Sequence, residues 1–251
     1  MKIMRRVRAV CAALMALCLI AAPLCARADL TARFIDVGQG DSCLITCDGE
    51  SMIVDGGTAD NSSKLVALMK ALDVDELKYM VNTHPHDDHV GGLCGPLNKV
   101  RVDAAYSSTL DYDQNYFISY KRYAQKQGVS LGTLSAGDTL KLGGADVYVL
   151  APIVDTADIS DLNDTSIILR VVYGRTSMLL TGDAGLGEER ALIDSGAEAA
   201  NLASTQFNPN DGPGGTRYYV SDDPAGFDRL AGLFLQEDVE TNAGLVDISR
   251  F

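Results

Sequence analysis

Three histidines and two aspartates lie within a six-residue stretch and offer the side chains that metal chemistry needs. The stretch reads His84-Pro85-His86-Asp87-Asp88-His89, is followed by Val90-Gly91-Gly92, and holds all three histidines of the 251-residue chain. Imidazole and carboxylate groups suit Zn²⁺, Mn²⁺ or Fe, and the sequence has no Cys-x-x-Cys spacing that would suggest a zinc ribbon. The alternative is an exposed polar loop with unrelated histidines, but the clustering of ligand types favours a metal site.

The apolar run before this stretch predicts the element that positions it. Residues 79–82 are of strand type and Pro85 follows, so we expect the stretch on a loop that leaves the C-terminal end of a buried strand. Further strands are predicted at residues 31–37, 42–46, 51–54, 100–106, 145–150, 166–172 and 177–180. Helices are predicted at residues 62–72, with Asn61 as the N-cap, and at residues 114–127 and 187–194. The alternation indicates an α/β domain, and the close spacing of the first strands predicts antiparallel pairing before the first helix.

Four further stretches, in the same order along the chain, resemble motifs of the metallo-β-lactamase superfamily. They are residues 34–42 (FIDVGQGDS), 53–57 (IVDGG), 163–169 (NDTSIIL) and 179–184 (LLTGDA). Within the superfamily, the chain resembles the soluble hydrolase-like domain of competence-type DNA-uptake proteins and their exported relatives. The resemblance covers roughly residues 32 to 195. It implies a four-layer αβ/βα sandwich, with the metals at one edge of two packed sheets and an incomplete or divergent C-terminus.

Carried over residue by residue, the resemblance implies a site for two divalent metal ions. His84 and His86 match the ligands of the first metal, Asp88 and His89 match those of the second, and Asp183 matches the carboxylate that bridges both. We expect Zn²⁺, with Mn²⁺ as the alternative. Three other aspartates, Asp36, Asp41 and Asp55, are expected to hold loops through Asx-type hydrogen bonds or to support the ligands from behind.

Two departures from the family pattern affect this ligand set. Many members have a histidine near Asn163 that completes the first metal, and here Asn163 or Asp164 would have to substitute through oxygen. Competence-type relatives also have a downstream His-His-Gly-Ser motif, whereas this chain has no histidine after His89. Residues 199–251 match nothing recognisable in the family, and are interpreted as a divergent ending, a frameshifted or truncated reading frame, or a new C-terminal element.

The resulting hypothesis is an exported metal-dependent hydrolase that cleaves a phosphodiester through a metal-bound hydroxide. His86 and Asp88 are the candidate catalytic residues, and Asp87 or Asp88 could accept a proton during the reaction. One alternative is hydrolysis of a cyclic amide or ester, such as a lactam or lactone. Another is a member that binds metal or ligand but has lost its hydrolytic role, which the missing downstream histidine favours.

The first 28 residues have the features of a secretory signal peptide. They carry five basic residues and no acidic one, an apolar run of residues 9–24, and the sequence Ala26-Arg27-Ala28 before Asp29. We therefore predict cleavage after Ala28 and a secreted or periplasmic protein without a stable membrane span, because the apolar run is short for a bilayer. An uncleaved anchor and a lipoprotein attached through Cys25 are the alternatives.

The rest of the chain is strongly acidic. It retains 16 basic and 34 acidic residues, a net charge of −18, compared with −13 for the whole chain. This charge disfavours non-specific nucleic-acid binding, although a metal site could still attract one phosphate. The expected partner is a small-molecule or phosphodiester substrate, and nothing in the sequence specifies an oligomeric state. The predicted organisation is a signal peptide (1–28), a metallo-β-lactamase-like domain (29–198) and a divergent segment (199–251).

Cysteines and tyrosines outside the histidine stretch have simpler interpretations. Cys43 and Cys47 would share one face of a strand, and buried small side chains are favoured over a disulfide. Cys94 follows His89 by five residues, which places it near the predicted metal. An aromatic cluster of Tyr112, Tyr116, Phe117, Tyr120 and Tyr123 could stack bases or sugars, but its helical spacing favours core packing.

Overall fold

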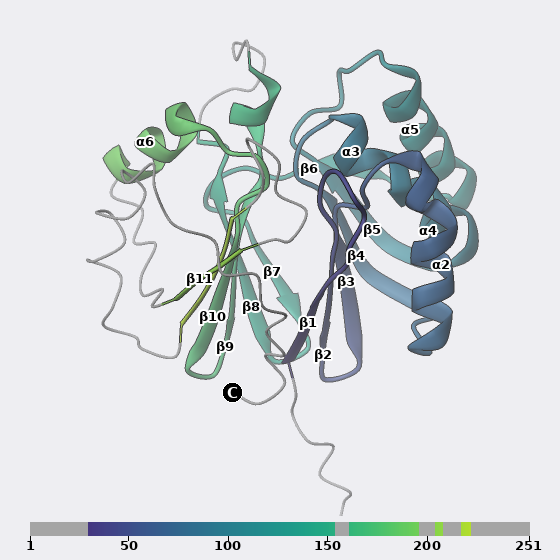
Figure 1. Cartoon of the computed structure of the whole chain (residues 1–251), viewed down its shortest axis with the longest axis horizontal. Coiled ribbons are helices and arrows are strands. Elements are labelled where there is room, and N and C mark those ends of the chain that lie inside the picture. Colours follow the sequence, from purple (N-terminus) through teal and green to yellow (C-terminus); the bar gives the residue numbers. More distant parts are fainter. Residues whose placement is uncertain (1–29, 154–160, 196–203, 208–216, 222–251) are drawn as a thin grey trace, which may run out of the picture.

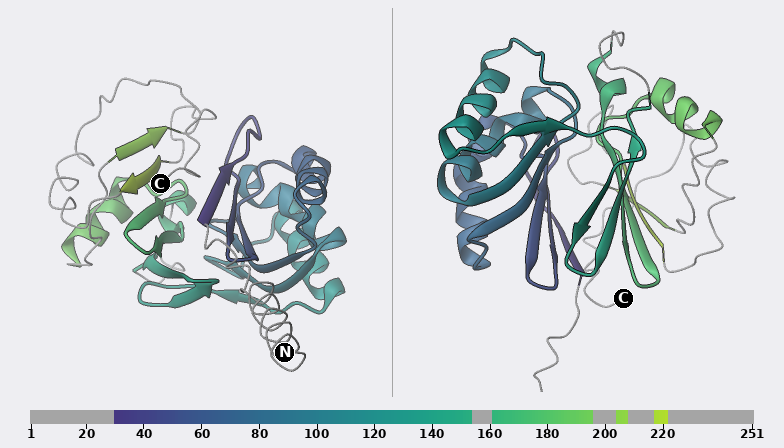
Figure 2. Two further views of the ribbon diagram at one scale, coloured as in Figure 1. Left: turned by 90° about the horizontal axis from the view of Figure 1, so that it is seen from below. Right: turned by 180° about the vertical axis from the view of Figure 1, so that it is seen from behind.

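Two six-stranded sheets face each other and form the centre of the molecule (Figure 1). The structure is a computed structural model that describes residues 30–153, 161–195, 204–207 and 217–221. Helices cover the outer side of each sheet, and the view from behind in Figure 2 shows the same layers. The predicted four-layer sandwich is therefore confirmed. The predicted signal peptide and most of residues 199–251 lie outside the described residues.

The first sheet carries its strands in chain order. They are β1 (Leu30–Phe34), β2 (Cys43–Cys47), β3 (Glu50–Val54), β4 (Glu76–Asn82), β5 (Arg101–Ser107) and β6 (Leu131–Thr133). The first three strands pair antiparallel and the later ones pair parallel, as the spacing of the opening strands predicts. Parallel neighbours present their C-terminal ends at one edge of the sheet, so the loop after β4 lies at that edge.

The second sheet pairs antiparallel throughout. Its spatial order is β7 (Thr139–Leu142), β8 (Ala145–Ala151), β9 (Ile168–Tyr173), β10 (Thr176–Leu180), β12 (Arg217–Ser221) and β11 (Ser204–Phe207). β12 pairs with β10, and β11 pairs with β12. The boundary at residue 198 stays a prediction, but these two strands lie beyond it and extend the same sheet.

Three predicted helices are present with nearly the expected bounds. They are α2 (Ser62–Ala71), α5 (Asn115–Gln127) and α6 (Leu186–Asp194). The short elements α3 (Asp87–Val90), η2 (Gly91–Leu93), α4 (Cys94–Lys99), η1 (Ala59–Asn61) and η4 (Leu162–Thr165) were not predicted. Among the described residues, no helix combines the length and the apolar character needed to span a bilayer.

Strand alternation divides the core into layers. On β2, Cys43, Ile45 and Cys47 face the second sheet, whereas Leu44 faces the helices that cover the first sheet. The two cysteines are buried and free, so the packing interpretation is confirmed. Cys94 lies in α4 and packs into the helical layer, where burial raises the pKa of its thiol to about 11.

The structure corrects one sequence-based detail and confirms another. Asn61 occupies the N-cap position of α2, but its side chain makes no cap hydrogen bond. Its amide donates instead to the carbonyl of Val37, at 2.9 Å. This hydrogen bond ties the loop after β1 to the start of α2. The aromatic cluster does pack into the core, with Phe117 and Tyr120 fully buried and the other three tyrosines partly buried against it.

Candidate metal centre

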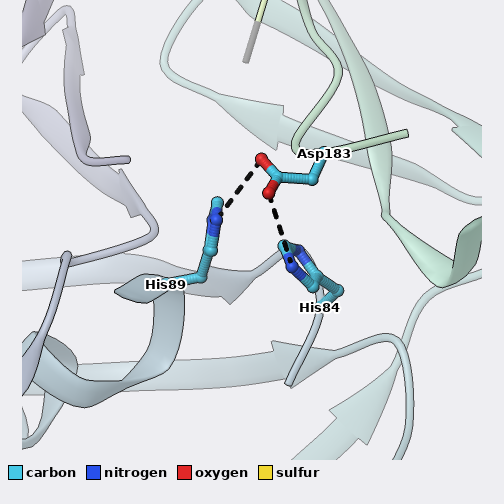
Figure 3. Close-up of side chains that lie close together, drawn as sticks. All are labelled: His84, His89 and Asp183. Atoms are coloured by element: carbon cyan, nitrogen blue, oxygen red, sulfur yellow. Dashed lines mark ion pairs between the residues drawn. The ribbon is translucent and has the colours of Figure 1, made fainter. Parts of the chain in front are cut away.

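His84, His89 and Asp183 meet where strands of the two sheets end. β4 ends at Asn82, directly before the loop that carries His84, and β10 ends at Leu180, shortly before Asp183. The backbone N–H of Ile167 donates to the carbonyl of Thr83 at 2.9 Å, which joins the two sheets at this edge. Figure 3 shows the two imidazole rings turned toward the carboxylate of Asp183.

The distances link five ligand-type side chains into one cluster, in which His84, His89 and Asp183 are the closest together. Nε2 of His89 lies 3.3 Å from Asp183 Oδ1, and Nε2 of His84 lies 4.0 Å from Asp183 Oδ2. His86 Nδ1 lies 3.0 Å from His84 Nε2, and Asp88 Oδ1 lies 3.9 Å from His89 Nε2. All five residues that the sequence predicts as ligands are therefore brought together.

The backbone that carries these ligands differs in part from the sequence prediction. His84 and His86 do lie on a loop, but Asp88 and His89 lie on the single-turn helix α3, which begins directly after His86. The backbone N–H of Val90 donates to the carbonyl of His86 at 3.0 Å and closes this turn. The turn brings His89 back toward the sheet, where its side chain is buried.

Asp55 holds His89 from behind. Its Oδ2 lies 2.9 Å from His89 Nδ1, and its carboxylate accepts hydrogen bonds from the backbone N–H and the hydroxyl of Thr83, at 2.8 and 2.7 Å. Burial lowers the pKa of His89, but the charges of Asp55 and Asp183 outweigh it and raise that pKa well above its ordinary value. Asp55 thus fixes the ring with Nε2 facing the centre, as expected for a supporting carboxylate.

His84 has a neutral environment behind its ring. Its Nδ1 lies 3.2 Å from the hydroxyl of Thr83 and 3.4 Å from that of Ser166. Burial, with the neighbouring His89 and His86 adding to it, holds the pKa of His84 well below its ordinary value. A neutral imidazole is the form that binds a metal ion.

The glycine turn after β1 supports Asp88. The amide of Gln39 donates to Asp88 Oδ2 at 3.2 Å, and a Cβ at Gly40 would overlap the backbone carbonyl of Asp88. Asp36 accepts the backbone N–H of Gly38 at 3.1 Å, which is the Asx-type bond expected there. Sequence reasoning missed Gln39 as a support, although it stands inside the motif of residues 34–42.

Asp41 forms part of a second buried group behind the centre. Ligand atoms of Asp41, Asp55 and His89 lie within 4.8 Å of one another. All three side chains are buried. His89 belongs both to this group and to the group with His84 and Asp183, so the two groups adjoin.

The region that lacks the family histidine contains two oxygen-bearing side chains with different surroundings. Asp164 is already engaged, because its Oδ1 accepts the backbone N–H of Gly185 at 3.0 Å. Asn163 Oδ1 is buried and has no hydrogen-bond partner in the part of the chain that the structure describes. A buried oxygen without a partner fits a centre that holds a metal ion, so Asn163 is the better substitute of the two.

Comparison with known proteins agrees with this geometry. A family model described as the metallo-beta-lactamase superfamily matches residues 35–226. The chain belongs to the metallo-beta-lactamase superfamily. Competence protein ComA of Neisseria gonorrhoeae is 29% identical over 170 residues, which cover 67% of this chain and 22% of that protein. The chain therefore spans about a fifth of that relative's length.

Solved structures with the same type of fold are more distant in sequence. Rm3 metallo-beta-lactamase is 16% identical, with a TM-score of 0.41 and coverage of 61% of this chain and 58% of that one. The metallo-beta-lactamase fold protein YhfI from Bacillus subtilis is 18% identical, with a TM-score of 0.40 and coverage of 59% and 60%.

Proposed function

We propose that this superfamily member is a metal-dependent hydrolase that cleaves phosphodiester bonds. The observation that carries the proposal is the convergence of His84, His89 and Asp183 from two sheets onto one point. Imidazole nitrogens and a carboxylate in this arrangement are a donor set for Zn²⁺ or Mn²⁺. His86 and Asp88 would complete the set for two ions.

The residues of the chain have separable roles in this proposal. Divalent ions bound here would lower the pKa of water and stabilise negative charge on the attacked group. Asp55 and Thr83 keep the imidazoles of His89 and His84 oriented toward the centre. Asp88 is partly exposed and held by Gln39, so it is placed to accept a proton from the side open to solvent.

The choice of a phosphodiester rests on the competence-type relative and on charge. That relative is named a competence protein, and it is 29% identical to this chain over 170 residues. The net charge of −13 works against long polyanions, so a short or single phosphodiester suits the chain better than a duplex.

An activity assay with two substrate classes tests this proposal. Purified protein loaded with Zn²⁺ or Mn²⁺ is expected to hydrolyse bis-p-nitrophenyl phosphate and to leave a chromogenic lactam intact. His89→Ala should lower the rate about 100-fold or more, because metal-assisted charge stabilisation is worth several kcal/mol. Asp60→Ala, an exposed aspartate on η1, serves as the matched control. Hydrolysis of the lactam without hydrolysis of the phosphodiester would contradict the proposed substrate class and favour a cyclic amide or ester.

A non-catalytic role is the second candidate, and the absence of any histidine after His89 favours it. Under this alternative the chain binds Zn²⁺ through the same residues but hydrolyses neither substrate. If folded protein binds the metal but hydrolyses neither substrate, the binding role is favoured over the hydrolase.

Export is proposed from the leader sequence. If residues 1–28 are removed on export, the mature chain begins at Asp29. Mass spectrometry of the protein from culture medium or periplasm is expected to find Asp29 as the first residue. A mature chain that retains the leader, or a lipid on Cys25, would contradict cleavage after Ala28.

A further inference from the structure

A buried acid follows the candidate ligand Asp183 by five residues and takes no part in the proposed reaction. Glu188, in the first turn of α6, is 5% exposed. Both of its carboxylate oxygens are buried and lack a hydrogen-bond partner in the described part of the chain. An ionised carboxylate in such a position would be costly, so the role of this side chain needs an explanation.

Asp164 joins the turn η4 to the start of the same helix. Its Oδ1 accepts the backbone N–H of Gly185 at 3.0 Å. A Cβ at Gly185 would lie 2.5 Å from Asp164 Oδ1, and one at Gly187 would lie 2.6 Å from Oδ2, so the carboxylate sits directly against the helix start. Because Gly185 follows Asp183 by two residues, this contact fixes the segment that carries the bridging ligand.

Ser166 connects the same turn to His84. Its hydroxyl lies 3.4 Å from His84 Nδ1, and its backbone is close enough to Glu188 to oppose the rise in the pKa of that acid. A Cβ at Gly182, the residue before Asp183, would lie 3.0 Å from the hydroxyl of Ser166 and 2.8 Å from that of Thr83. Residues 164–166 therefore contact the surroundings of both ligands.

Two carboxyl groups at one buried position cannot both ionise without strong repulsion. Asp164 is partly exposed and accepts a backbone N–H, whereas Glu188 is buried, so burial disfavours the charged form of Glu188. Asp164 is the charged side chain that acts on Glu188. On α6 itself Glu189 and Arg190 follow. β8 and β9 meet this region with Ala151 and Ile168, and Arg170 lies two residues after Ile168 on the same face of β9.

We propose that Glu188 is a positioning residue: its buried side chain keeps the turn of residues 164–166 packed against α6, and thereby holds His84 and Asp183 in place. The inference rests on the proposed function, because it concerns how those metal ligands are held. Ionisation of Glu188 beside Asp164 would push the turn away from the helix and loosen both ligands.

The titration of Glu188 should make the folded protein less stable as pH rises. Burial raises the pKa of Glu188 from 4.5 to about 9, Asp164 raises it further, and the backbone of Ser166 opposes the shift. A raised pKa in the folded state means that stability falls as pH rises from about 4.5 to about 9. Glu188→Gln mimics the protonated form and should lack this dependence.

The test compares zinc-loaded wild type with Glu188→Gln and with the control Glu189→Gln, the neighbouring acid on α6. The rate at which a chelator removes zinc is measured from pH 7 to pH 10. We expect wild type and control to lose zinc at least tenfold faster near pH 10 than near pH 7, and Glu188→Gln to keep a nearly constant rate. Equal pH profiles for all three proteins would overturn the proposal.

Two further measurements separate this inference from the proposed function. NMR of ¹³C-labelled glutamate carboxyls should show one group that titrates near pH 9 in wild type and is missing in Glu188→Gln, whether or not the protein binds zinc. Titration of Glu188 near pH 4.5 would contradict the inference. The inference would also be contradicted if Ca²⁺ raised the melting temperature of wild type but not that of Glu188→Gln. A cation, and not a proton, would then neutralise the Glu188 carboxylate. Failure to bind zinc at pH 7 would contradict the proposed function alone.

Discussion

Asp55 shows how one residue links backbone geometry to the candidate metal centre. Its φ angle is 57°, in the left-handed region that aspartate and asparagine adopt more readily than most residues. In this conformation the side chain turns back to accept hydrogen bonds from Thr83 and to contact His89. The motif of residues 53–57 therefore specifies a turn and a ligand support together.

Replacement of this carboxylate tests its role in supporting the ligands. Asp55→Asn keeps the side-chain shape and tolerates the positive φ, but it loses the charge that orients His89. We expect Zn²⁺ affinity to fall about 10- to 100-fold, measured by competition with a chromophoric chelator. The exposed Asp60→Asn should bind as wild type does, and equal affinities in both folded variants would refute the supporting role.

At the scale of elements, the turn between β1 and β2 is held against α3. Gly38 and Gly40 both have positive φ, at 78° and 86°, but only Gly40 lies against the backbone of Asp88. The turn also supplies Gln39, which contacts Asp88.

Alanine at each glycine separates backbone strain from this contact. Gly38→Ala should cost about 1 kcal/mol, because only the φ preference is lost. Gly40→Ala should cost about 2–4 kcal/mol and weaken zinc binding, since the turn must also move away from α3. Urea unfolding measures both effects, and equal losses for the two variants would show that the turn does not position Asp88.

The helix α5 stabilises the layer behind the centre through its buried face. Phe117→Ala should lower the free energy of unfolding by about 3–5 kcal/mol, because the ring is fully buried against Tyr112 and Tyr120. Ile118→Ala, at 46% exposure, should cost less than about 1 kcal/mol. Chemical unfolding that gives similar values for both would contradict the assigned helix face.

Helices whose apolar residues repeat at a regular spacing could be predicted from the sequence, and shorter helices could not. The bounds of α2, α5 and α6 differ from prediction by a residue or less at each end, because their apolar positions repeat at helical spacing. α3 spans only four residues, too few for a period to emerge, so Asp88 and His89 were expected on a loop. The contacts of Ser166 with His84 and of Asp164 with Gly185 join segments far apart in the chain, which local patterns cannot reveal.

At the scale of the whole molecule, charge limits what can approach the centre. The net charge of −13 predicts no retardation of linear duplex DNA in a gel-shift assay at micromolar protein and about 150 mM salt. The same protein should still accept a small phosphodiester, because binding would depend on the metal centre alone. Salt-sensitive duplex binding in the absence of metal would contradict this expectation.

The fold unites two sheets so that ligands from residues 84–89 and 183 meet at one edge. The most direct test of this account is the metal content of the purified chain by elemental analysis, beside Asp183→Asn and His86→Ala. We expect about two zinc or manganese ions per wild-type chain, and at most one in each variant, since each loses one ligand of the proposed centre. Wild-type protein without bound metal, or variants with unchanged metal content, would contradict the account.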